Sequence, residues 1–288
     1  MKHPPEPRLE YYESQRVRLR YAVWGTPGDG KPVMMLIHGG QDHCRNWDFV
    51  ADHLVDRYTI YAPDLRGHGD SAWAIGGMYS IPEFTLDVAA LADGIPGKLT
   101  VIGHSLGGAI ALQYAGTCPE KVDRLVSIEG WGPPLAEHRP AHKRMREWIA
   151  HMRDVERRQP RRYATIEDAT KRMRDANPHL TPEMARHLTI HGSKQNDDGT
   201  LSWKFDNYVR IHSPYEFNLD DAMVIWSQIT APTLLVKGSE SWAVDPEKTG
   251  RADAIRDRKT VIIKKAGHWV HHDRLDEFMG DVEAFLAG

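Results

Sequence analysis

The chain has 288 residues, a formal net charge of −3, 41% hydrophobic residues and 9% aromatic residues. This composition is typical of a folded globular protein, and the nearly balanced charge gives no general attraction to nucleic acid or to anionic membranes. The two cysteines do not suffice for a disulfide framework, and no apolar run approaches the roughly 18 residues of a membrane span. Because residues 1–10 lack the apolar segment of a secretion signal, we expect a cytoplasmic protein.

Apolar runs alternate with stretches at helical spacing up to about residue 130, and this pattern predicts a mainly parallel sheet with helices on both faces. Residues 33–37 are wholly apolar, as expected of a central strand buried on both sides. The predicted strands are residues 8–14, 17–24, 33–37, 58–62, 99–102 and 122–128, and the predicted helices are 46–57, 81–92 and 108–115.

The regular alternation stops after Glu129, and residues 131–226 form a charged, helical stretch interrupted by prolines. Basic residues are dense near its start, but acidic residues are interleaved with them, which favours a solvated helix face over a nucleic-acid site. The simplest division is an α/β core of residues 1–130 and 227–288 with a helical cap of residues 131–226 inserted after the strand 122–128. The alternation then resumes with predicted strands at 233–237 and 259–264 and predicted helices at 246–256 and 270–287.

Ser105 lies in Gly103-His104-Ser105-Leu106-Gly107, between a predicted strand and a predicted helix. A strand-to-helix turn this sharp strains its apex residue and needs small residues two positions to either side, which Gly103 and Gly107 provide. The N–H groups that begin the helix then face the place where negative charge would develop on a carbonyl oxygen under attack. The pattern predicts a nucleophilic serine rather than a serine that merely caps a helix.

A serine hydroxyl needs an adjacent base, and the base needs a carboxylate to orient it. Among the 16 histidines, His268 is the best candidate base, because it follows the last predicted strand in a loop at the carboxyl edge of the sheet. His271 and His272 follow it closely, but no matching carboxylate or cysteine spacing accompanies them. We therefore expect no metal and no cofactor.

The chain resembles an α/β-hydrolase over essentially its whole length. The resemblance rests on four motifs in the family's order: His38-Gly39-Gly40, the segment Asp64 to Ser71, the turn at Ser105, and Ala266-Gly267-His268. The resemblance implies an oxyanion hole formed by the backbone N–H groups of Gly40 and Leu106. A glycine in that loop would let its backbone approach a substrate oxygen closely.

The triad acid departs from the common family pattern. Most family members place an aspartate three residues after a glycine that corresponds here to Gly238, but this position holds Ser241. Glu129, at the end of the strand 122–128, and Glu240, one residue out of register, are the two replacements. A subset of the family carries its acid at the strand end occupied by Glu129, so we favour Glu129 and keep Glu240 as the alternative.

The sequence thus predicts a serine hydrolase that acts on an ester or similar activated carbonyl through an acyl-enzyme. Related dehalogenases and epoxide hydrolases use an aspartate nucleophile, so Ser105 argues against their chemistry. Two alternatives stay open: a cofactor-independent dioxygenase that uses a histidine–acid dyad, and a ligand-binding pseudo-hydrolase. We expect an apolar acyl substrate, no nucleic-acid partner, and a monomer or homodimer. The predicted pocket residues are His38, Trp47, His104, Trp131 and Trp269.

Overall fold

The computed structural model describes residues 5–133, 139–211, 213–215 and 217–288. Its centre is an eight-stranded sheet in the order β1-β2-β4-β3-β5-β6-β9-β10. β1 pairs antiparallel with β2 and β2 with β4, whereas the remaining neighbours are parallel, which confirms the predicted sheet. The strands of this sheet are Arg8–Ser14 (β1), Val17–Trp24 (β2), Val33–Ile37 (β3), Thr59–Pro63 (β4), Leu99–His104 (β5), Val122–Ile128 (β6), Thr233–Gly238 (β9) and Arg258–Ile263 (β10).

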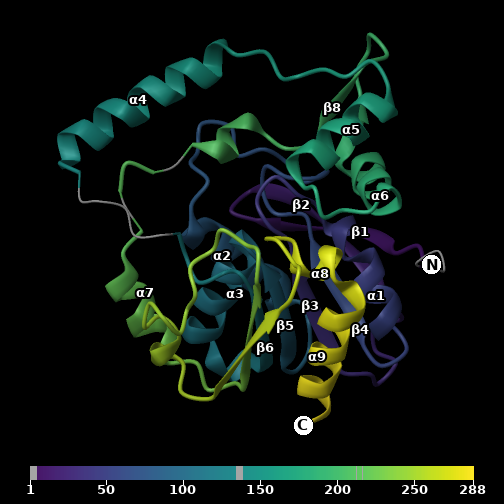
Figure 1. Ribbon diagram of the computed structural model, residues 1–288, viewed down its shortest axis with the longest axis vertical. Coiled ribbons are helices and arrows are strands. Elements are labelled where there is room, and N and C mark those ends of the chain that lie inside the picture. Colours follow the sequence, from purple (N-terminus) through teal and green to yellow (C-terminus); the bar gives the residue numbers. More distant parts are fainter. Residues whose placement is uncertain (1–4, 134–138, 212, 216) are drawn as a thin grey trace.

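Helices cover both faces of the sheet, as predicted (Figure 1). One core layer packs α2, α3 and α7 against the sheet, and the other packs α1 and α9 against its opposite face. β3 and β5 lie between the two layers and are almost wholly buried, which explains their continuous apolar sequences. The helices are Asp48–Leu54 (α1), Ile81–Asp93 (α2), Leu106–Thr117 (α3), Ala141–Arg157 (α4), Ile166–Ala176 (α5), Pro182–Gly192 (α6), Leu219–Trp226 (α7), Val270–Asp273 (α8) and Leu275–Ala287 (α9).

The segment between β6 and β9 contains α4 to α7 and a small hairpin of Ser193–Gln195 (β7) and Leu201–Trp203 (β8). Figure 1 shows α4, α5 and α6 at one end of the molecule, above the sheet and its covering helices. α7 instead packs on α3, where Ala222 and Trp226 join the core. The division into a core and a cap of residues 131–226 stays a prediction. No described helix has both the length and the apolar character needed to cross a membrane.

Three predicted elements differ from the structure. The predicted helix 246–256 is instead made of turns and one 3-10 turn, Ala252–Ala254, and Gly250 within this stretch has a left-handed φ of 71°. The buried Arg251 side chain here donates to the backbone oxygens of Trp131, Gly132 and Pro133. The predicted helix 46–57 begins as a 3-10 turn, and the predicted helix 270–287 is divided at Arg274 into α8 and α9. The β7–β8 hairpin was not predicted.

The core also contains several histidines that burial keeps neutral, since an imidazolium is costly to remove from water. Burial lowers the pKa of His38 and His43 to about 4 and that of His68 and His272 to about 3. The opposite effect operates at Asp42, whose pKa burial raises to about 7.

These buried histidines predict a loss of stability in mild acid. Each takes up a proton in the unfolded chain below about pH 6.5 but not in the folded protein until near pH 4, so the unfolded state binds more protons in that window. Asp42 opposes this effect, as does Asp273, whose pKa burial also raises. The histidines outweigh these two carboxyl groups, because burial also lowers the pKa of His104, His191 and His271. We expect the free energy of unfolding, measured in urea, to fall by several kcal/mol between pH 7 and pH 5. An unchanged or higher value at pH 5 would contradict this account of the core.

Candidate active site

Ser105 occupies the turn between β5 and α3, in the strained conformation that the sequence predicts. Its φ is 52° and its ψ is −116°, and its N–H donates to the Ile128 oxygen at 2.8 Å. A Cβ at Gly103 would lie 2.2 Å from the Gly107 oxygen, and a Cβ at Gly107 would lie 2.1 Å from the Ile37 oxygen. Both flanking positions therefore require glycine, and the turn presents a partly exposed serine at the carboxyl end of the sheet.

This close packing predicts that Gly103→Ala destabilises the protein. The new methyl would collide with backbone rather than with a movable side chain, and overpacking of this kind costs about 1–3 kcal/mol or more. Gly280→Ala is the matched control: it lies in α9 with nothing within 4 Å of the added Cβ, so it should not destabilise. Urea unfolding of the two variants measures the difference, and equal free energies of unfolding would show that the turn tolerates a side chain.

His268 lies in the loop between β10 and α8, where its ring reaches both of its predicted partners. The Ser105 hydroxyl is 2.9 Å from His268 Nε2, the distance of a hydrogen bond in which the serine donates. On the other side of the ring, His268 Nδ1 lies 2.8 Å from Glu129 Oε2. The three side chains, separated by up to 163 positions in the chain, thus form one continuous line of hydrogen bonds.

Glu129 is the carboxylate that reaches His268. It follows β6 with a left-handed φ of 53°, and its side chain is fully buried between that strand and β9. Its Oε1 accepts a hydrogen bond of 2.8 Å from the Gly238 N–H, and Lys237 Nζ is 4.0 Å away. Glu240, the alternative, is about half exposed and faces His179 at 3.6 Å. The arrangement therefore favours Glu129 as the orienting acid.

Ser241 is a member of this arrangement that the sequence analysis did not identify. It occupies the position where most family members carry aspartate, and its hydroxyl donates a hydrogen bond to Glu129 Oε2. The same oxygen atom lies within hydrogen-bond distance of His268 Nδ1, so the serine helps to fix the position of the Glu129 carboxylate beside the ring. The exchange of aspartate for serine is thus compatible with an acid supplied by the neighbouring strand.

Ser241→Ala should reduce turnover without abolishing it. The substitution removes one donor to a buried carboxylate, and a hydrogen bond to a charged group contributes about 1.5–3 kcal/mol. We therefore expect kcat/KM for an activated ester to fall by about tenfold or somewhat more. Ser239→Ala, whose hydroxyl accepts from the Lys265 N–H at the loop surface, is the control and should retain full activity. Equal rates for both variants would exclude a positioning role for Ser241.

The expected oxyanion donors lie beside Ser105. Gly40 is exposed, and a Cβ on it would lie 3.9 Å from the Leu106 side chain, so the loop and the start of α3 are adjacent. The N–H groups in the first turn of a helix have no partner within the helix, which leaves that of Leu106 available to a ligand. A Cβ on the preceding Gly39 would be 3.4 Å from Ser105 Cβ, which shows how closely this loop approaches the serine.

His38 supports this loop and does not line a pocket as predicted. It is fully buried, its Nδ1 donates to the Gly39 oxygen at 2.7 Å, and its Nε2 accepts from the Leu65 N–H at 3.0 Å. These two bonds require a neutral ring, in agreement with a pKa that burial lowers to about 4. His38 therefore stabilises the conformation of the Gly39-Gly40 loop by hydrogen-bonding to backbone atoms.

Three further predicted pocket residues are packed inside the protein. Trp47 is fully buried in the core and stacks on His271 at 4.7 Å. His104 lies beneath His268, with its Nε2 2.9 Å from the His268 oxygen, and burial holds its pKa well below the usual range. Trp131 is 2% exposed and donates from its indole N–H to the Val244 oxygen. Trp269 is half buried against the cluster that includes Leu180 and Met184, and its role as a pocket wall stays a prediction.

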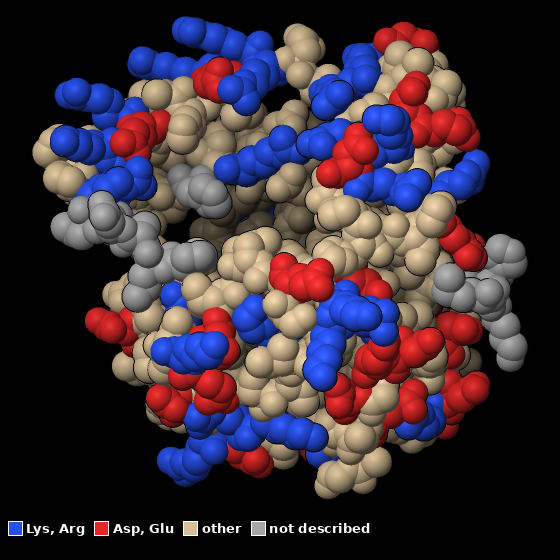
Figure 2. Space-filling model, in the orientation of Figure 1, with Lys and Arg blue, Asp and Glu red and all other residues tan. Residues whose placement is uncertain are grey.

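Trp242 is a more exposed aromatic residue near the reacting groups, and the sequence analysis did not identify it. Its ring centroid lies 4.6 Å from that of His268, and 67% of the residue is exposed. Figure 2 shows a hollow in one face of the molecule, between the helical segment (α4 to α6) and the part that contains the eight-stranded sheet. Lys and Arg side chains gather over α4 in the same view. Two separate open grooves, of about 590 Å³ and 320 Å³, lie on charged residues around α5 and do not include Ser105.

Within the described part of the chain, side chains that could together hold a metal ion are grouped at one place, namely Asp48, His187 and His191, and none of them belongs to the Ser105 site. His268 and its neighbours His271 and His272 are not grouped in this way. His268 instead lies within hydrogen-bond distance of a hydroxyl on one side of its ring and a carboxylate on the other.

Comparison with known proteins identifies the family. The family model of the alpha/beta hydrolase fold matches residues 32–275. The esterase Rv0045c of Mycobacterium tuberculosis is 30% identical over 251 residues, which cover 86% of this chain and 80% of that protein. The pimeloyl-[acyl-carrier protein] methyl ester esterase of Nitrosomonas europaea is 27% identical over 257 residues, 84% of this chain and 90% of that one.

A solved structure shows the same architecture. The hypothetical protein PA1622 of Pseudomonas aeruginosa PAO1 has a TM-score of 0.83 and 25% sequence identity, and the match covers 99% of this chain and 100% of that chain. The sheet order, the turn at Ser105 and the family model lead to one conclusion: this chain belongs to the α/β hydrolase family.

Proposed function

We propose that the protein is a serine hydrolase that cleaves a carboxylic ester, or a similarly activated carbonyl, through an acyl-enzyme. The observation that carries the proposal is the line of hydrogen bonds from the Ser105 hydroxyl through His268 to Glu129, with distances of 2.9 Å and 2.8 Å. A hydroxyl, an imidazole and a buried carboxylate in this order are the parts that acyl transfer by serine requires.

In the proposed first step, Ser105 Oγ attacks the carbonyl carbon while its proton passes to His268 Nε2. The negative charge that develops on the carbonyl oxygen is stabilised by the N–H groups of Gly40 and Leu106. His268 then gives the proton to the departing alcohol oxygen, and the acyl group stays on Ser105. Glu129 holds the ring in the tautomer with hydrogen on Nδ1 and stabilises the imidazolium, without taking the proton itself.

The second step repeats this chemistry with water in place of the serine. His268 removes a proton from the water, the resulting hydroxide attacks the acyl carbon, and the proton returns to Ser105 as the carboxylic acid leaves. The residue at the turn favours this sequence over the alkyl-ester chemistry of relatives with an aspartate nucleophile. The relatives that carry the name esterase support an ester bond as the target.

A series of p-nitrophenyl esters of increasing acyl length tests the proposal. Wild-type protein should hydrolyse at least one of them, with a burst of nitrophenol that equals the amount of enzyme whenever release of the acyl group is slow. No hydrolysis of any ester would overturn the proposal. Equal turnover by wild type and Ser105→Ala would also overturn it, and would favour chemistry that uses only His268 and Glu129.

A further inference from the structure

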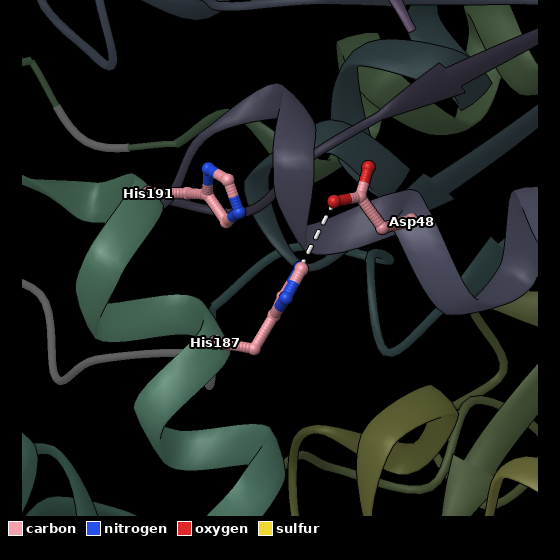
Figure 3. A group of neighbouring side chains, drawn as sticks. All are labelled: Asp48, His187 and His191. Atoms are coloured by element: carbon pink, nitrogen blue, oxygen red, sulfur yellow. Dashed lines mark ion pairs between the residues drawn. The ribbon is translucent and has the colours of Figure 1, made fainter. Parts of the chain in front are cut away.

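A second group of reactive side chains lies where the helical segment meets the core, apart from Ser105. His187 and His191 lie one turn apart on α6, and Asp48 begins α1 (Figure 3). The two imidazoles extend from one face of α6 towards the carboxylate of Asp48, as Figure 3 shows. Two elements that are about 140 positions apart in the chain thus direct nitrogen and oxygen atoms to one point.

The distances suit a single cation. One ligand atom from each of the three residues lies within 4.8 Å of the others. His187 Nε2 is 2.9 Å from Asp48 Oδ2, and the ring centroids of His187 and His191 are 4.6 Å apart. Two histidines spaced by four residues on a helix share one face and can ligate the same ion. Small changes of the His191 side chain would bring all three atoms to the bond lengths of about 2.0–2.2 Å that Zn²⁺ requires.

His191 has no competing partner for its ring nitrogens. Within the described residues its ring packs against that of His187 and lies near Arg45, but its side chain makes no hydrogen bond and no ion pair. Both ring nitrogens of His191 are therefore free of hydrogen bonds in the part of the chain that the structure describes. An imidazole nitrogen in this situation can serve as a metal ligand.

Asp48 is held in place by a second group. Arg45 Nε donates to both carboxylate oxygens, at 2.9 Å and 2.8 Å, and Arg45 Nη1 is 3.0 Å from Glu6 Oε2. Such a bond fixes the orientation of a carboxylate ligand, and the carboxylate oxygens keep further lone pairs for a metal. The guanidinium charge also repels a cation, so the site should favour ions with strong affinity for imidazole over Mg²⁺ and Ca²⁺, which prefer oxygen ligands.

We propose that Asp48, His187 and His191 form a binding site for one Zn²⁺ or a similar divalent transition-metal ion. The ion joins α6 of the helical segment to α1 of the core. Because three protein ligands leave one position of a tetrahedral ion open, water completes the coordination. His187 and His191 are only partly buried, which gives the ion a path from solvent. The site stands independently of ester hydrolysis, and the proposal departs from the sequence-based expectation of no metal.

Titration of chelator-treated, full-length protein with Co²⁺ and with Zn²⁺ tests the site. Wild-type protein should develop the visible absorption of tetrahedral Co²⁺ at one ion per chain, and Zn²⁺ should displace it. Because the ion binds the folded protein, a hundredfold excess of Zn²⁺ over its dissociation constant should raise Tm by about 5 °C. Mg²⁺ at the same concentration should produce neither change. Both readouts are independent of catalytic activity.

His191→Gln is the decisive variant because the histidine makes no bond that the fold needs. We expect the affinity for Zn²⁺ to fall by at least about tenfold. Even the loss of a residue that only hydrogen-bonds to a metal ligand typically weakens metal binding by about that factor. Asp48→Asn, from the other element, should do the same, and circular dichroism reports whether each variant is folded. His142→Gln, at an exposed histidine of α4, is the matched control and should bind as wild type. Absence of binding by wild type, or full binding by His191→Gln, would overturn the proposal.

Discussion

Ser105→Ala should lower kcat for a p-nitrophenyl ester by between about 10⁴-fold and 10⁶-fold while the protein stays folded. The expected loss is this large because the proposed acyl-enzyme forms on the hydroxyl oxygen itself, so the remaining groups can only bind and polarise the substrate. The fold should persist because the substitution removes only one hydroxyl, which belongs to a partly exposed residue and bonds to His268. Steady-state kinetics with the best ester of the series measures the change.

A matched serine separates this effect from general damage. Ser227→Ala removes an exposed hydroxyl that donates to the Val224 oxygen at the end of α7, and it should keep the wild-type kcat. Urea unfolding should give both variants a free energy within about 1 kcal/mol of wild type. A kcat for Ser105→Ala within tenfold of wild type would contradict nucleophilic catalysis at this residue.

Glu129→Gln should produce the second-largest loss, about 10⁴-fold in kcat. The amide keeps the shape of the side chain and can still accept from the Gly238 N–H. In that orientation, however, the NH₂ group takes the place of Oε2 and faces His268 Nδ1 and Ser241 Oγ. An NH₂ group is a donor, so it cannot accept a hydrogen bond from either of them. The imidazole then loses its charge partner and favours the wrong tautomer. Kinetics of Glu129→Gln and Glu240→Gln, measured side by side, test both candidate acids.

The two candidate acids make opposite predictions. Glu240 is about half exposed and pairs with His179, so Glu240→Gln should keep wild-type activity. The reverse result, with Glu240→Gln inactive and Glu129→Gln active, would contradict the assignment of Glu129. The double variant Glu129→Gln with Ser241→Asp moves the carboxylate to the usual family position. Because Ser241 already touches the oxygen that faces His268, this variant should recover part of the lost kcat.

The sequence was most informative about the fold and the site where backbone geometry allows only a few residue types at a position. The turn at Ser105 is predicted from two glycines between a strand and a helix, and the collisions that a Cβ at Gly103 or Gly107 would make with the backbone show why no other residue fits. The parallel strands were predicted from continuous apolar runs, since each is buried on both faces. Placing His268 near Ser105 followed from the rule that parallel strands end at the same edge of the sheet.

The sequence was less informative about which face of a loop or helix a side chain occupies. Trp47 and His104 lie close to motif ends in sequence, yet their side chains point into the core rather than into a pocket. The contact between Ser241 and Glu129 was not predicted, because a serine at the usual aspartate position suggests only that the acid is missing. Its hydrogen bond depends on Glu129, which follows the neighbouring strand. The group of Asp48 and His187 joins positions about 140 residues apart, and no local pattern indicates such a contact.

Tertiary contacts also decided the elements that were predicted wrongly. Residues 246–256 have helical spacing, but the bonds from Arg251 to Trp131 and Gly132 hold this stretch in turns. The β7–β8 hairpin is too short for a strand pattern, with three residues in each strand around a turn at Gly199, whose φ is 81°. Short elements of this kind are stabilised by their surroundings more than by their own propensity.

Labelling with a fluorophosphonate probe, followed by peptide mass spectrometry, tests the central claim most directly, because the probe reacts with a serine only when a base activates its hydroxyl. We predict one phosphonyl group per wild-type chain, attached to Ser105, and no label on Ser105→Ala or, in the same time, on Glu129→Gln. Folded wild-type protein that stays unlabelled, or that carries the label on another residue, would contradict the proposed assembly of Ser105, His268 and Glu129.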